Sequence, residues 1–272
     1  AMAAGKPFAM LVEMMGWQES MFVLTVAGII LGVVTFFVIE DKEVKTPSEK
    51  SSFNIKAVYD GLIEILLKPM TWLLGLYGFL MYLPLAGFAD LWGTSFIQSA
   101  YNLPRTEASL YVSYLYFGIG IGSPLSSFVL NCFKSYKIVM TLTSLATLAF
   151  FGLVVYVPLP NTFFLGIALF MCGAMAGAQF LAFSAVTSIN KPEATATASG
   201  VHNMLCMTSG VVAQPLIGAV LDRFVDPACP IDERIYSPQA FEAGMSVITA
   251  GLILSLVSIF FMRKMGYDKA TA

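Results

Sequence analysis

Long stretches of this chain contain no charged side chain. The runs 21–39, 138–157 and 247–262 are uncharged throughout, and each approaches the ~20 residues that a helix needs to cross ~30 Å of hydrocarbon. A segment in lipid must satisfy its backbone hydrogen bonds internally, so helices and closed barrels are the structures that can span it. These runs do not alternate apolar and polar residues as barrel strands do. The sequence therefore predicts an all-α membrane protein.

The composition supports this class and argues against others. Charged residues make up 12% of the 272 residues, about half of the ~25% found in soluble domains. The net charge of −2 argues against nucleic acid as a partner. The four cysteines form no Cys-x-x-Cys pair, so we expect free thiols and no metal site. We also expect no cofactor.

The apolar runs and the breaks between them predict a helix remnant at 1–15 and seven full spans after it. Gly16 opens a tight turn, and Thr106 is the expected N-cap of the third full span. Proline-containing breaks at 158–161 and 190–193 separate neighbouring spans. The expected spans are 19–39, 70–98, 108–132, 136–157, 162–188, 195–221 and 241–263.

A charged linker follows the first full span. Residues 40–52 read EDKEVKTPSEKSS, and in 53–68 apolar residues recur at helical spacing opposite Lys56, Asp60 and Glu64. This pattern indicates an amphipathic helix at the membrane surface. Placing the linker in the cytoplasm puts eleven basic residues on that side and three on the other. By the positive-inside rule, the linker and the C-terminus are therefore expected to be cytoplasmic.

Four short motifs occur one after another along these spans. Gly-Trp-Gln stands at 16–18, Leu-Trp-Gly at 91–93, Gly-Ile-Gly-Ile-Gly-Ser-Pro at 118–124 and Gly-Val-His-Asn at 200–203. Together with the long linker and the six spans after it, they resemble the second half of a major facilitator superfamily transporter. Two positions depart from the family's pattern: Gln18 replaces an arginine, and the loop after Gly122 lacks an acidic residue.

The resemblance implies a major-facilitator-type helix bundle and a domain plan. In that family twelve helices form two six-helix bundles joined by a cytoplasmic loop. Residues 1–39 would then be the end of the N-terminal bundle, comprising a remnant of helix five and helix six. Residues 40–69 would be the linker, and 70–272 the C-terminal six-helix bundle. The abrupt start at Ala1 agrees with this plan, and the partners would be the lipid bilayer, a small-molecule solute and the missing N-terminal helices.

Glycines cluster on two of the expected spans. They allow helix backbones to approach closely where lipid supplies no hydrophobic drive. Such a contact is either plain close packing or part of a bundle that slides during gating, and the residues alone leave both open. The glycines concerned are Gly118, Gly120 and Gly122 on one span, and Gly173 and Gly177 on another.

A few polar side chains are expected at membrane depth, where each is a functional-site hypothesis because its burial in lipid is costly. Lys6 could bind a carboxylate or phosphate, and Asp90 could take part in proton coupling or bind a cationic group. His202 is either a group that titrates near neutral pH or a structural residue. The remaining substrate-binding or coupling candidates are Tyr82, Gln179, Asn203 and Gln214; Tyr77, Tyr114 and Tyr116 could also line a cavity.

No catalytic constellation is visible. The chain has one histidine and lacks both a Gly-x-Ser-x-Gly elbow and a P-loop, so we expect no enzyme. The leading hypothesis is a secondary transporter in a bacterial inner membrane. It would move a small polar solute, anionic or zwitterionic, driven by a proton gradient or by the solute's own gradient. A truncated remnant or scaffold is the alternative, and a seven-helix receptor fits the long linker poorly.

Overall fold

The computed structural model describes residues 6–38, 55–226, 229–230 and 234–262. The elements of this part are helical, and seven of them are long and apolar enough to cross a membrane. The expected all-α class and the seven spans are thus confirmed. The chain divides into two compact units, Ala1–Ala57 and Val58–Ala272.

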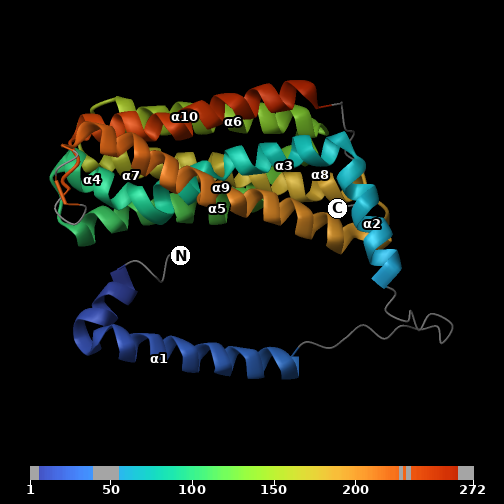
Figure 1. Cartoon of the computed structure of the whole chain (residues 1–272), viewed down its shortest axis with the longest axis horizontal. Coiled ribbons are helices and arrows are strands. Elements are labelled where there is room, and N and C mark those ends of the chain that lie inside the picture. The colour runs from blue at the N-terminus through green and yellow to red at the C-terminus, as the bar shows by residue number, and fades with distance from the viewer. Residues whose placement is uncertain (1–5, 39–54, 227–228, 231–233, 263–272) are drawn as a thin grey trace. The chain divides into compact units, whose positions relative to one another are not determined.

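The first unit contains α1 (Lys6–Val38), whose helix is interrupted at Gly16 (Figure 1). Gly16 has φ 84° and ψ 166°, a conformation that L side chains rarely adopt and glycine tolerates. The Ser20 hydroxyl donates to the Gly16 carbonyl at 2.6 Å, which stabilises the start of the second segment. The chain therefore turns at the position that the sequence predicted, and a full span follows.

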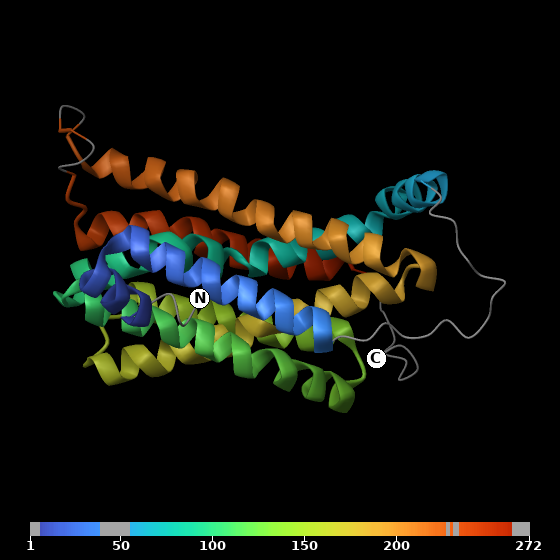
Figure 2. The same cartoon turned by 90° about the horizontal axis from the view of Figure 1, so that it is seen from below.

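The second unit is a bundle of six spans with α2 at one end (Figures 1 and 2). Its elements are α2 (Ile55–Leu67), α3 (Pro69–Met81), η3 (Pro84–Trp92), α4 (Gly93–Tyr101), α5 (Arg105–Phe133), α6 (Tyr136–Tyr156), α7 (Thr162–Ala176), η4 (Gly177–Phe180), α8 (Leu181–Ser188), η5 (Pro192–Ala194), α9 (Thr195–Leu221), η6 (Asp222–Phe224) and α10 (Pro238–Phe261). The segments α3, η3 and α4 form one span, and α7, η4 and α8 form another.

Packing within the bundle follows two groups of helices. The helix α7 lies against α5 and α6, whereas α3 packs against α9 and α10. The fully buried Phe88 of η3 connects its span to α6. Its ring contacts Phe96 of α4 and Phe151 of α6 edge-on, at centroid distances of 5.7 Å. Such aromatic pairs add to the packing that holds helices together in lipid.

Helix starts in the bundle depend on local capping. The Asn161 side chain accepts from the amides of Phe163 and Phe164 at 3.1 and 3.2 Å, and so caps α7. The expectation that Thr106 caps α5 was wrong. Extended backbone at Pro104 places the helix start at Arg105, and the Pro104 carbonyl takes the capping role. Thr106 therefore lies inside the first turn.

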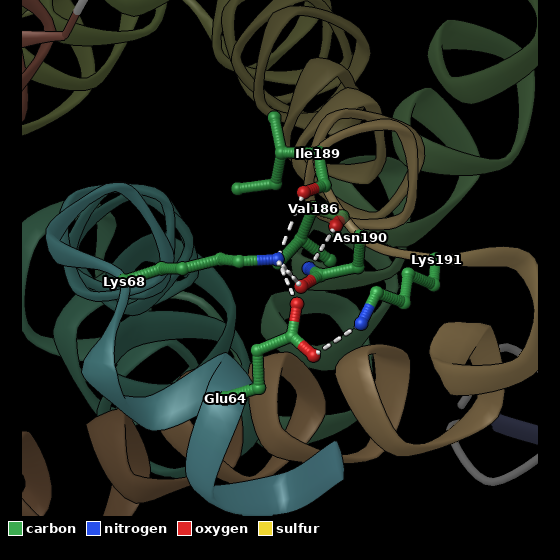
Figure 3. A network of polar contacts seen from close by, with 6 residues as sticks. All are labelled: Glu64, Lys68, Val186, Ile189, Asn190 and Lys191. Carbon is green, nitrogen blue, oxygen red and sulfur yellow. Dashed lines mark hydrogen bonds and ion pairs between the residues drawn. The ribbon is translucent and has the colours of Figure 1, made fainter.

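Glu64 is the centre of a polar network that fixes α2 to the bundle (Figure 3). Its carboxylate pairs with Lys68 at 3.3 Å and with Lys191 at 2.9 Å. Lys68 also donates to the Ile189 carbonyl at 3.2 Å and to the Asn190 side chain at 2.8 Å. The end of α2 is thereby tied to the connection between α8 and α9.

The charges around Glu64 give this network a pH dependence. Lys191 first, and then Lys68, lower the pKa of the Glu64 carboxyl below its ordinary value of 4.5. A lowered pKa means that the pairing stabilises the fold above that pH and is lost as the pH falls through the lowered value.

We expect Glu64→Gln to lower the melting temperature of the purified protein at pH 7. The difference from wild type should shrink as the pH falls below about 4.5, because the wild-type carboxylate is then protonated as well. Differential scanning fluorimetry measures it, with Glu107→Gln at the other end of the bundle as control. A difference that stays constant with pH would show that the ion pairs do not cause it.

Candidate functional site

The span Pro69–Tyr101 is broken near its middle by the π-helical segment η3. Pro84 opens this segment and has no backbone N–H to donate. The amides of Leu85 and Ala86 both donate to the Tyr82 carbonyl at 3.0 Å. Short π-helical segments within α-helices occur frequently at functional sites, so the break is the natural place to look for one.

Gln214 of α9 donates a hydrogen bond to the backbone of the broken segment. Its side-chain amide donates to the Ala86 carbonyl at 2.8 Å. In return, the Trp92 indole donates to the Gln214 backbone carbonyl at 3.2 Å. These two bonds hold α9 against η3, and they supply partners for backbone groups that lipid could not satisfy.

A shallow groove of about 530 Å³ runs beside these bonds, between η3 and α9. Gln214 is the polar residue of its lining, and Gly210, Pro215 and Gly218 contribute small side chains or none. The groove is lined by Leu91, Trp92, Gly210, Val211, Gln214, Pro215 and Gly218. Its shape and mixed lining suit a small solute with an apolar part.

Asp90 lies at this break with its side chain exposed on the bundle surface. One carboxylate oxygen accepts a short hydrogen bond from the Tyr116 hydroxyl on α5. Tyr82 is within electrostatic reach of the same carboxylate. Asp90 is eleven residues from the end of the span at Tyr101, which is about 16 Å at ~1.5 Å per residue. A carboxylate therefore sits deep within the expected hydrocarbon layer.

The closest helix contact in the bundle joins α5 to α7 and η4 through glycines. A methyl group at Gly118 would overlap the Phe170 carbonyl oxygen, and one at Gly122 would overlap the Ala174 carbonyl. Gly173 and Gly177 meet α5 in the same way from the other side. Gly120 differs, since an added Cβ would meet no atom within 4 Å. Four of the five glycines thus take part in a backbone-to-backbone contact, and Gly120 does not.

A search for related families matches this chain, over residues 2–215, to the family described as the Major Facilitator Superfamily. The chain belongs to the major facilitator superfamily. That assignment confirms the resemblance seen in the sequence, and with the seven apolar helices it makes the chain an integral multi-pass membrane protein. No curated protein gave a match.

The fold of this superfamily member is similar to a solved structure. The crystal structure of a bacterial homolog of the human lysosomal transporter Spinster, in an inward-facing and unoccupied conformation, aligns with a TM-score of 0.55. The two chains are 17% identical, and the alignment covers 90% of this chain and 58% of the other. The present chain thus spans a little over half the length of that transporter, and at this identity the likeness concerns the fold.

His202 of α9 lies buried between helices of the six-span bundle. It is fully buried, with its Nε2 3.4 Å from the Cys206 sulfur and its ring edge-on to Phe183 at 4.4 Å. A Cβ at Gly78 would come within 2.8 Å of the His202 ring. Of the two readings that the sequence left open, this placement favours the structural one.

The other candidates are scattered. Gln179 is buried in η4, where its side-chain oxygen has no hydrogen-bond partner among the described residues. Asn203 is exposed on α9, one position after the buried His202. The Lys6 side chain lies outside the described part of the chain. Of the predicted residues, the structure brings Tyr82, Asp90 and Gln214 to one region at the broken span.

Two residues of this region have contacts that the sequence did not predict. Tyr116 was expected only as a cavity-lining tyrosine, and Trp92 only as part of the Leu-Trp-Gly motif. The signal that could have found Tyr116 was the need of a deep carboxylate for a hydrogen-bond donor. Trp92 has a further role, because its ring also meets Tyr236 edge-on at 6.2 Å, beside the Asp222–Arg234 ion pair of 2.8 Å.

Gly118→Ala and Gly120→Ala form a matched pair that tests the glycine contact. At Gly118 the added methyl must displace the backbone of α7, so we expect a loss of about 1–3 kcal/mol, as for other overpacked sites. At Gly120 the same change meets open space, so we expect no loss, and a gain of up to about 1 kcal/mol from helix propensity. Thermal unfolding in detergent compares the two, and equal losses would contradict the contact.

Proposed function

We propose that this chain is the second half of a secondary transporter that moves a small polar solute by alternating access. Residues 1–39 would end the N-terminal bundle, and 40–69 would link it on the cytoplasmic side to the six-helix bundle of 70–272. The observation that carries the proposal is the exposed Asp90 on a broken span, beside a groove at membrane depth. A purely structural bundle has no need of such a carboxylate, since an ionisable group at that depth is costly.

The break also supports movement of a solute past this face. The groove presents Trp92 and Gln214, and Val211 on its wall is 75% exposed. Superfamily membership supports transport, and the absence of a P-loop in this sequence leaves an ion or solute gradient as the energy source.

The charges of the candidates bear on the solute. Lys6, on the last part of the N-terminal bundle in this plan, would favour a carboxylate or phosphate. Asp90 on the second bundle would favour a cation or a proton. A zwitterionic solute carries a positive group that can pair with Asp90, whereas a plain anion would leave Asp90 without a partner. We therefore place zwitterions ahead of anions within the class that the sequence predicted.

Accessibility of Val211 from both sides of the membrane tests alternating access without knowledge of the solute. The exposed Cys132 and the half-buried Cys229 would be replaced by serine, and Val211→Cys introduced. A membrane-impermeant maleimide should then label position 211 when added from either side, because the groove opens to each side in turn.

Two single-cysteine controls define the sides. Native Cys132, near the α2 end, and Asn161→Cys, near the opposite end, should each react from one side only. Labelling of Val211→Cys from one side alone would contradict alternating access and favour the remnant or scaffold instead.

A further inference from the structure

The charge of Asp90 has no opposite charge near it. Among the described residues, the ion pairs join Glu64 to Lys68 and Lys191, and Asp222 to Arg234. All of these lie at the two ends of the bundle. A carboxylate at membrane depth needs a proton, a cation or a paired side chain to offset the cost of leaving water. The described bundle supplies none of these to Asp90.

The side chains around Asp90 hold it in a fixed orientation and leave it accessible. Tyr116 donates to one of its oxygens, and an ionised carboxylate has further acceptor sites for a second donor. Tyr116 on α5 is half-buried, whereas Asp90 is exposed. The hydrogen bond therefore positions the carboxylate without covering it.

The residues that follow Asp90 in the chain line an apolar groove. Trp92, two residues away, lines it with Leu91 and Val211, and Tyr82 is in electrostatic reach of the carboxylate. A carboxylate beside aromatic faces binds organic ammonium groups by an ion pair together with cation–π attraction. A groove of about 530 Å³ next to it can take the apolar part of a small molecule.

We propose that Asp90, positioned by Tyr116, binds the ammonium group of the transported solute, so that the substrate is a small organic amine or a zwitterion. This inference rests on the proposed transport function and specifies its substrate class. An inorganic cation is the weaker occupant, because metal ions require several oxygen or other ligands. Within the described residues, no group of three His, Cys, Asp or Glu side chains could supply them.

The titratable groups near Asp90 are few. Tyr116 of α5 donates to it, Tyr82 just after α3 is in electrostatic reach of it, and Cys206 of α9 is in electrostatic reach of Tyr82. No described basic group joins them. Proton binding by Asp90 is therefore the competing explanation that a test must separate from ammonium binding.

The test measures the thermal stability of the full-length protein in detergent against increasing concentrations of choline chloride and of propylammonium chloride. We expect either amine to raise the melting temperature saturably at constant pH and ionic strength. Potassium butyrate and sodium chloride serve as the matched anion and the inorganic cation, and we expect neither to do so.

Three variants assign the effect to the site. Asp90→Asn should abolish the shift, and Tyr116→Phe should weaken it at least several-fold in apparent affinity, because the carboxylate loses its positioning bond. Glu242→Gln, which removes an exposed carboxylate in α10, should leave the shift unchanged. If Asp90→Asn does not give a monodisperse protein, Tyr116→Phe, which keeps the charge, carries the test.

The remaining outcomes would overturn the proposal. Equal stabilisation of wild type and Asp90→Asn by amines would remove Asp90 from the site. Stabilisation by sodium alone would indicate an inorganic cation site, and stabilisation by low pH without any amine effect would indicate a proton site. Two-sided labelling of Val211→Cys without an amine effect would leave transport standing and reject this substrate class. An amine effect together with one-sided labelling would leave amine binding at Asp90 standing and reject alternating access.

Discussion

Inside a bilayer, backbone N–H and C=O groups have no water to bond, so the protein itself must supply their partners. This requirement is the main constraint on the bundle. Pro84 opens the π-helical segment of the span Pro69–Tyr101, within the expected hydrocarbon layer, where polar backbone groups have no water to bond. The Gln214 side chain of α9 donates to the Ala86 carbonyl, and the Trp92 indole of η3 donates to the Gln214 backbone carbonyl. The segment is therefore bonded to a helix more than a hundred residues away in the sequence, and Asp90 lies in the same segment.

A second feature complements this break. Glycines bring α5 and α7 into backbone contact. Tyr116, which holds Asp90, comes from the same helix α5. The carboxylate is thus attached both to the broken span and to the tightest helix pair of the bundle.

The sequence predicted the course of the chain better than the chemistry of the site. Apolar runs and the breaks between them located all seven spans, because twenty apolar residues have few alternatives in a bilayer, and Gly16 marked the first turn. Thr106 was misplaced as a cap, since the extended Pro104 already fixed the helix start. The π-helical form of the break and the Tyr116 bond depend on partners distant in sequence, which no local pattern reveals. Gly120 shared its spacing with Gly118 and Gly122 but faces away from α7.

The account rests on two bundles that move against each other, and a distance measurement tests this most directly. Spin labels at Gln18→Cys in α1 and Asn161→Cys before α7 would report, by double electron–electron resonance, on the separation of positions expected on the same side of the membrane. The full-length protein, with its native cysteines replaced, would be reconstituted in lipid nanodiscs. Alternating access predicts two resolved distance populations whose ratio changes with conditions. A single narrow distribution that stays the same in every condition would contradict it.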